Sequence, residues 1–348
     1  IGPVGRDYAT FTAAEADVTN IGGSADLVFE NEAIVFEADA ATYSENVYFG
    51  STLTTDATRN VTYKPAAGSE HGGVVGAGVV INSASINFFR DSFMLFEGIE
   101  VNGSSTQTLN IDACTGTVTR RCIINATTQG FVIGNTALAV EVSNCVISSN
   151  NYSFLLQCST GAQAVTLYNN TILNGPSGLA AIRVLQSGTA TMSLDAVNNL
   201  ILNAAGMYLA SGTVTVTGSN NFGGSNNPFP AAIQGSPYPI TPTTNTTPGF
   251  GDYAIYEPGT GALVVVADNA ALGGGVGPAA NAGVPVLDIN GVQRIGGGCD
   301  PGAFEGVRSR SLDVWDVVTA THNTPGTFGE MMQQVYLLTR TAAAGRIV

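Results

Sequence analysis

The chain has 348 residues, of which 44% are hydrophobic and only 11% charged, and its formal net charge is −14 at pH 7. This acidic balance argues against a nucleic-acid partner, because a phosphate backbone would be repelled. No apolar run approaches the length of about 20 residues that a membrane-spanning helix needs. The 43 glycines are spread along the chain, which indicates many turns. We therefore expect a protein with an ample core, no membrane span and no nucleic acid.

Cysteine and histidine usage gives no sign of a metal centre. The five cysteines are an odd number for a disulfide framework, and none stands at a CxxC or Cys/His spacing. His71 and His322 are the only histidines. We predict neither a metal nor a cofactor. The cysteines are Cys114, Cys122, Cys145, Cys158 and Cys299.

Residues 1–22 are predicted to form an N-terminal cap. Thr12, with Glu15 three residues later, fits a capping box that opens a short helix ending near Asn20. A helical lid of this kind would shield the open edge of a following sheet from pairing with another chain.

Residues 23–219 contain a repeat, which is clearest in five segments. Equivalent positions recur at Ile99, Cys122, Cys145, Thr171 and Leu200, and the first two steps are equal in length. Two residues further on, each segment has an aliphatic side chain: Val101, Ile124, Ile147, Leu173 and Leu202. Asparagine then follows in four of the five, at Asn102, Asn125, Asn174 and Asn203, with Ser148 as the exception. The period of this repeat matches one turn of a β-solenoid.

Two further strand-like stretches separated by Gly, Asn and Ser turns accompany each repeated segment, as at Ala139–Ser143 and Ile182–Gln186. Earlier coils are indicated by strand composition at Val61–Tyr63 and Ile86–Phe89. The predicted fold is all-β: a single-stranded right-handed parallel β-helix with three short strands per coil.

Two columns of this solenoid have a predicted chemistry. The recurring asparagines tolerate left-handed backbone angles, and their amides can bond to the same amide one coil away. Cys122 and Cys145 occupy one column in successive coils, about 4.8 Å apart and within disulfide range. Free, buried thiols are the favoured interpretation, since cysteine is a common core residue.

Residues 220–306 are predicted to be an irregular loop and the closing segment of the β-helix, with a strand near Leu263–Val266. Residues 307–348 are predicted to form two helices, the second capped by Thr327 with Glu330 at its third position. This hairpin either folds onto the last coil or makes a subunit contact or attachment to a larger particle. Trp315 would anchor either packing.

Residues 286–305 resemble the closing signature of a large family of right-handed β-helix proteins. The matching positions are Asp288, Gly291, Arg294, Asp300, Gly302, Ala303, Phe304 and Glu305. The opening Gly5-Arg6-Asp7-Tyr8 is similar to the phage members of that group, the fibre and tailspike proteins. The tail Leu312–Arg346 resembles the helical segments that end many phage structural proteins. The resemblance implies that the closing segment returns along the solenoid, with Arg and Asp satisfying backbone groups.

Many β-helix proteins cleave polysaccharides, which needs two carboxyl groups about 5–10 Å apart across a sugar-binding cleft. Outward positions of neighbouring coils lie about 5 Å apart. The candidate carboxylates are Glu97, Glu100, Asp112, Glu141 and Asp195. Lys64 is distant in sequence, no histidine falls in the central repeats, and outward residues there are mostly small and uncharged. We therefore assign no catalytic residue and favour a protein without enzymatic activity.

The preferred hypothesis is a structural and adhesive protein of a bacteriophage virion, a tail or head fibre or spike that contacts host glycans. Its expected partners are other virion proteins and copies of itself, with a trimer favoured. One alternative is a tailspike depolymerase that cuts capsule or lipopolysaccharide. Another is a secreted or cell-surface bacterial β-helix.

Overall fold

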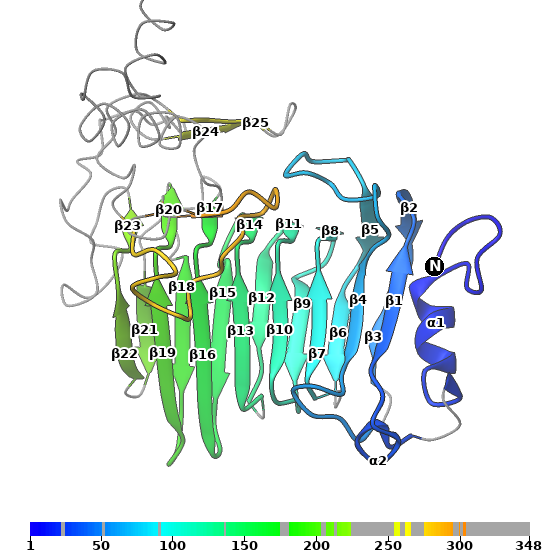
Figure 1. The fold of residues 1–348 in the computed structure, drawn as a ribbon. Helices are drawn as coiled ribbons and strands as arrows, with labels where there is room; N and C mark the ends of the chain where they lie inside the picture. The colour runs from blue at the N-terminus through cyan, green and yellow to red at the C-terminus, as the bar shows by residue number, and fades with distance from the viewer. Residues whose placement is uncertain are drawn as a thin grey trace, which may run out of the picture. The chain divides into compact units, whose positions relative to one another are not determined.

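The computed structural model describes most of the chain up to Gly223 and short stretches beyond it. The described ranges are 1–21, 25–50, 53–89, 92–135, 137–174, 181–202, 207–211, 214–223, 254–257, 262–265, 275–294, 299 and 302–303. They form a right-handed solenoid of parallel strands (Figure 1). The predicted fold class is confirmed. The predicted helices of residues 307–348, and Asp300, Phe304 and Glu305 of the closing signature, lie outside the described residues.

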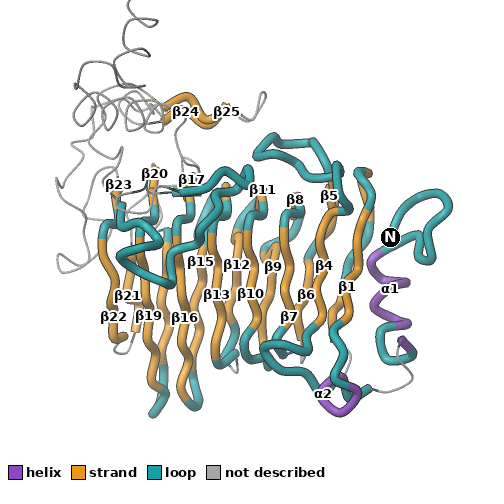
Figure 2. The backbone as a smooth tube through the Cα atoms, viewed as in Figure 1, coloured by secondary structure: helices purple, strands orange, loops and turns teal. Residues whose placement is uncertain are grey.

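Three parallel sheets run along the solenoid (Figure 2). The first contains β1 (Ile34–Ala38), β4 (Val61–Pro65), β7 (Met94–Glu97), β10 (Thr117–Arg120), β13 (Ala139–Ser143), β16 (Ala162–Tyr168), β19 (Thr191–Val197) and β22 (Val214–Ser219). The second contains β2 (Ala41–Ser44), β5 (Val79–Ser83), β8 (Glu100–Gly103), β11 (Ile123–Ala126), β14 (Val146–Ser149), β17 (Thr171–Asn174), β20 (Leu200–Leu202) and β23 (Phe222–Gly223). The third contains β3 (Tyr48–Phe49), β6 (Ile86–Phe89), β9 (Gln107–Asp112), β12 (Gln129–Ile133), β15 (Phe154–Cys158), β18 (Ile182–Gln186) and β21 (Met207–Ser211). A separate antiparallel pair joins β24 (Ala254–Glu257) to β25 (Ala262–Val265), at the predicted strand.

Stacked aliphatic side chains fill the interior, because alternate residues of each strand point inward. In the second sheet the inward column is Ile81, Val101, Ile124, Ile147, Ile172 and Ile201, all fully buried. The predicted continuation through Leu173 and Leu202 is wrong by one residue. Thr171 lies beside Val146 rather than Cys145, so this coil is one residue shorter than predicted. The double asparagine at 169–170 concealed the shift, because Asn169 rather than Asn170 corresponds to Asn144.

A column of left-handed residues turns each coil from the first sheet into the second. Its members have φ between 53° and 68° and are Gly98, Arg121, Asn144, Asn169, Asn198 and Asn220. Glycine and asparagine are the residues that adopt this conformation most readily. Asparagine does occupy a tight corner, as predicted. The asparagines that do so are the ones in this column and not the predicted Asn102, Asn125, Asn174 and Asn203.

Asparagine ladders occur in two places. The buried ladder directly follows the corner: the Oδ1 of Asn199 accepts from the Asn170 backbone N–H and Nδ2 at 3.1 and 3.0 Å, and the same pattern links Asn199 to Asn221. The outward ladder joins Asn82, Asn102 and Asn125 on the second sheet at 3.0 and 2.9 Å. The predicted ladder thus exists for Asn102 and Asn125. Asn174 instead pairs with Ser149, and Asn203 lies outside the described residues.

Cys122 and Cys145 continue the buried ladder toward the N-terminus. The Cys145 backbone N–H donates to Asn170 Oδ1 at 3.0 Å, and the Cys122 backbone N–H donates to Cys145 Sγ at 3.5 Å. All five cysteines are buried and outside disulfides, and for Cys122 and Cys145 this is the predicted state. Burial raises the pKa of the Cys145 thiol, so this sulfur remains an uncharged member of the core.

The N-terminal segment covers the first coil with the helices α1 (Phe11–Asp17) and α2 (Leu27–Glu30) (Figure 1). The ring of Phe11 packs edge-on against Tyr43, and Glu15 accepts a hydrogen bond from the Tyr63 hydroxyl at 2.7 Å. The lid is therefore present. The predicted capping box is wrong, since the helix starts earlier and Thr10 accepts from the Ala13 backbone N–H.

A carboxylate from the first coil, Glu45, holds the start of α1. It accepts from the backbone N–H groups of Phe11 and Thr12 at 2.9 and 2.8 Å and from the Thr12 hydroxyl. A negative charge at a helix N-terminus is favourable, because it faces unpaired N–H groups. Thr12 and Glu15 thus bond to the solenoid rather than to each other.

Part of the outer face of the second sheet is also apolar, and a returning segment covers it. Outward Ile123, Val146 and Leu200 are at most 4% exposed. We call residues 286–294, with Cys299, Gly302 and Ala303, the closing strap; in Figure 1 its orange part crosses the ends of these strands. The Ala303 backbone N–H donates to Thr171 Oγ1 at 2.9 Å.

Buried polar side chains pin the strap to the corner column. Arg294 donates to Asn144 Oδ1 and to the Gly302 carbonyl, both at 2.8 Å, and Asn144 donates to the Leu287 carbonyl at 2.6 Å. Asp288 accepts from the backbone N–H groups of Asn290 and Val292 and so closes a turn at Gly291. Arg294 and Asp288 therefore have the backbone-satisfying role that was expected of them.

Candidate functional site

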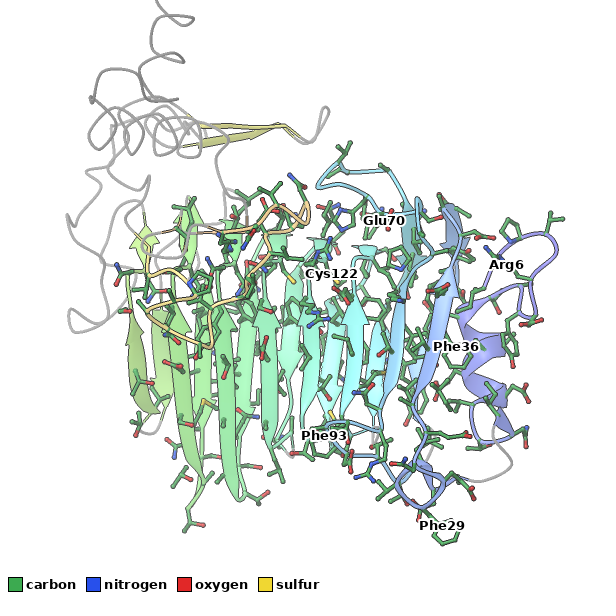
Figure 3. The ribbon with its side chains drawn as sticks, viewed as in Figure 1. Arg6, Phe29, Phe36, Glu70, Phe93 and Cys122 are labelled. Atoms are coloured by element: carbon green, nitrogen blue, oxygen red, sulfur yellow. The ribbon has the colours of Figure 1, made fainter. Side chains whose placement is uncertain are left out.

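A cavity of about 500 Å³ opens at the corner between the first and second sheets. It lies where two coverings of the second sheet meet: the corner loop, which we define as residues 66–78, and the closing strap. Figure 3 shows Glu70 on the corner loop, which projects beside β5. The cavity is lined by Glu37, Lys64, Pro65, Ala67, Glu70, His71, Gly72, Glu97, Gly98, Arg121, Ile289 and Asn290.

One wall of the cavity is a row of alternating charges at the ends of the first-sheet strands. Glu37 lies opposite Lys64, with Nζ and Oε1 3.2 Å apart. Glu97 lies opposite Arg120, with Nη2 and Oε2 3.0 Å apart. Tyr63 is opposite Phe96, so Lys64 and Glu97, the next residues, continue the row. Lys64 is distant from Glu97 in sequence, but the long coil between β4 and β7 returns the chain to the same column.

Arg121 stands at the floor of the cavity in an unusual backbone conformation. Its φ is 57°, in a column otherwise occupied by glycine and asparagine. Its guanidinium contacts Glu97 Oε1 through Nη1 and the Ile289 carbonyl through Nε, both at 3.4 Å. Glu97 is thereby held between two arginines. Nη2 has no hydrogen-bonding partner among the described residues.

His71 ties the corner loop to the same place. Its Nε2 is 2.8 Å from the Arg121 carbonyl, and its Nδ1 accepts from the Gly73 backbone N–H at 2.8 Å. These partners define the neutral ring with the proton on Nε2. Burial lowers the pKa of His71 to about 4. The expectation that no histidine lies near the central coils is wrong, because the corner loop brings His71 across to Arg121.

Glu100 is the candidate carboxylate with the most altered environment. It is fully buried on the outer face of the second sheet, beneath the corner loop. Its Oε2 accepts from the Gly76 backbone N–H at 2.5 Å, and its Oε1 accepts from Asn125 Nδ2 at 3.4 Å. Burial raises the pKa of this carboxyl. Glu100 thus anchors the loop and has no access to a substrate.

The other three candidate carboxylates are engaged on the solenoid surface. Asp112 accepts from the Ala113 backbone N–H at 2.9 Å, and Glu141 accepts from the Ser143 hydroxyl at 2.9 Å. Asp195 accepts from the hydroxyls of Tyr168 and Thr217. Burial, and next the hydrogen bond to Asp195, raise the pKa of the Tyr168 hydroxyl.

Among the five candidate carboxylates, only Glu141 and Asp195 share a column at a spacing that suits a hydrolase. Thr166 lies between them, one coil from each, which places them two coils or about 10 Å apart. Inverting hydrolysis also needs one carboxyl to donate a proton as the general acid. Asp195 accepts from hydroxyl groups at both oxygens, and Glu141 accepts from one at Oε1. Both carboxyl groups are thus placed as hydrogen-bond acceptors, and we assign no general acid to the pair.

The described residues include no group of three or more His, Cys, Asp or Glu side chains that could hold a metal ion. Over the same ranges, no helix has the length and apolar composition required to span a bilayer. Comparisons with protein-family models and with curated proteins find no match.

Proposed function

We propose that this chain is a structural and adhesive component of a bacteriophage virion, a tail or head fibre or spike, that contacts host surface glycans. Two lines support the proposal. One is a set of resemblances: residues 286–305 resemble a family of β-helix proteins, the opening its phage members, and the tail the ends of phage structural proteins. The other is a solenoid of regular parallel sheets that presents uncharged polar side chains, such as the outward asparagine ladder, on its outside.

The observation that carries the proposal is the state of the surface carboxylates. Glu97 lies between Arg120 and Arg121, Glu141 and Asp195 accept from hydroxyls, and Glu100 is sealed beneath a loop. Groups held in this way stabilise a surface rather than transfer protons. A passive shaft with polar contact sites is the function that such a surface serves best.

The depolymerase alternative is tested by incubating the intact oligomer with a panel of capsule and lipopolysaccharide preparations. We expect no release of reducing ends or unsaturated sugars. The intact assembly is required because a site can form between subunits. Activity that is lost in Glu97→Gln or Asp195→Asn would overturn the proposal in favour of a depolymerase.

Placement on a virion is tested separately by imaging phage particles with antibodies raised against the purified chain. Labelling of a fibre, spike or other surface feature is the expected result. Production of the folded chain by bacteria that carry no phage genes, together with its recovery on their surface, would favour the secreted bacterial protein instead.

A further inference from the structure

We propose that the corner cavity is a binding site for a neutral, hydroxyl-rich saccharide, two or three sugar units long at most. The inference rests on the proposed adhesive function and gives it a location and a ligand class. No catalytic step is involved. The site consists of the Glu97–Arg121 pair, Lys64, Glu70 and the strap residue Asn290.

The cavity has the size and construction of a ligand site. Its volume of about 500 Å³ falls within the range of small-molecule pockets. Three separate parts of the chain form its walls: the ends of the first-sheet strands, the corner loop and the closing strap. The loop and the strap are fastened independently, by the His71 contact to Arg121 and by the Asn144 contact to Leu287. The walls are therefore preformed, which lowers the entropic cost of binding.

The charges in the cavity select for a neutral ligand. Three carboxylates, Glu37, Glu70 and Glu97, face it against the two cations Lys64 and Arg121. Both cations already have acidic partners. A polyanionic sugar would meet an excess of negative charge, and a flat apolar ligand would find no aromatic side chain among the lining residues.

Hydroxyl groups suit this lining because each can donate and accept at once. A vicinal diol can donate to a Glu97 or Glu70 oxygen and accept from Arg121 Nη2 or Lys64 Nζ. Glu70 makes no ion pair or hydrogen bond within the described ranges, and neither does Arg121 Nη2. These are the positions at which a ligand gains bonds without displacing any.

The backbone of Arg121 gives independent support. A bulky residue at φ 57° is costlier than the asparagine that stands at the equivalent corner of four later coils. Asn144 shows that asparagine at this corner can bind a strap carbonyl. Fastening the strap therefore does not require an arginine. What arginine adds is a guanidinium that reaches into the cavity.

The test is calorimetric titration of the intact protein with glucose, galactose, mannose, rhamnose, N-acetylglucosamine, their disaccharides and glucuronate. We expect at least one neutral sugar to bind, and Glu97→Gln and Arg121→Asn each to weaken that binding by about tenfold. Arg121→Asn is expected to fold, because asparagine fits the corner. Glu141→Gln, the same change on the same sheet away from the cavity, serves as the control and is expected to bind normally.

Three results would overturn the inference: no binding across the panel, binding that survives both cavity variants, or tighter binding of glucuronate than of every neutral sugar. Failure here is distinguishable from failure of the proposed function. If the protein is found on virions but binds none of these sugars, only the proposed binding site is refuted. If the chain binds sugar but is absent from virions, the proposed binding site stands and the proposed virion role is refuted.

Discussion

At the scale of single residues, the stacked interior makes each inward side chain sensitive to charge. Ile147 is fully buried between Ile124 and Ile172. We expect Ile147→Asp to cost more than about 4 kcal/mol, because it buries an unpaired carboxylate. Thermal denaturation followed by circular dichroism measures the loss.

The adjacent Ser148 provides the matched control, since it lies on the same strand and faces outward. Ser148→Asp is expected to change the free energy of unfolding by less than about 0.5 kcal/mol. If the two variants melted at the same temperature as the parent, the inward column through Ile147 would be wrong.

His71 makes stability depend on pH in a defined direction. Its pKa falls from the ordinary 6.5 to about 4 on folding, because the buried ring resists protonation. Above pH 6.5 neither state is protonated at His71. Between pH 6.5 and about 4 only the unfolded state takes up the proton, so the stability contributed by His71 falls as the pH decreases. The total loss is about 3 kcal/mol.

His71→Gln isolates this contribution, since glutamine does not titrate. Denaturant unfolding of the parent and the variant is compared between pH 7.5 and 4. We expect the difference in unfolding free energy between them to shrink or reverse as the pH falls. If the unfolding free energies of the parent and the variant changed with pH in parallel, the pKa of His71 would not be lowered by folding.

At the scale of elements, the two asparagine ladders differ in energy because only one is buried. Asn199→Ala removes the acceptor of the Asn170 N–H groups and the donor to the Leu167 carbonyl. We expect a loss of about 2 to 5 kcal/mol, since both partners remain buried and lose these hydrogen bonds. Asn82→Ala, at the exposed end of the outward ladder, is expected to cost below about 1 kcal/mol, and equal losses in urea unfolding would contradict this distinction.

Regular elements were predictable from sequence wherever successive coils have similar lengths. The repeat identified β8, the strands from β10 to β20, and the shared column of Cys122 and Cys145, because a nearly constant period keeps the pattern in phase. It did not reveal β1, β2 and β3. The step from Tyr43 to its partner Ile81 is much longer than the later steps, and the corner loop within it obscures the period.

The cavity depends on contacts that sequence spacing cannot reveal. Lys64 and Glu97 come from different coils, and Arg121 contacts the Ile289 carbonyl across 168 residues of the chain. Such contacts arise only after coils of unequal length have stacked. The closing strap was anticipated through resemblance rather than through periodicity, because it belongs to no strand of the repeat.

At the scale of the whole molecule, the solenoid and the C-terminal segment are predicted to be separable. The compact unit Ile1–Glu305 contains all the stacked coils of the described residues. We expect deletion of residues 312–348 to leave these coils folded and to change the mass of the oligomer or its incorporation into particles. Light scattering on the truncated chain is the direct measurement. An unchanged mass together with normal incorporation would leave the segment with a capping role alone.

Unequal coil lengths have a consequence for how such a protein can change its dimensions. The step from Tyr43 to Ile81 contains the entire corner loop and the step from Val101 to Ile124 contains no such insertion. Each step nevertheless advances the chain by one strand spacing of about 4.8 Å. Extra residues form loops that project from the corners, and they do not lengthen the stack of coils. The length of the solenoid is therefore set by the number of coils. Insertions at a corner change the surface loops, and only duplication or loss of an entire coil changes the length.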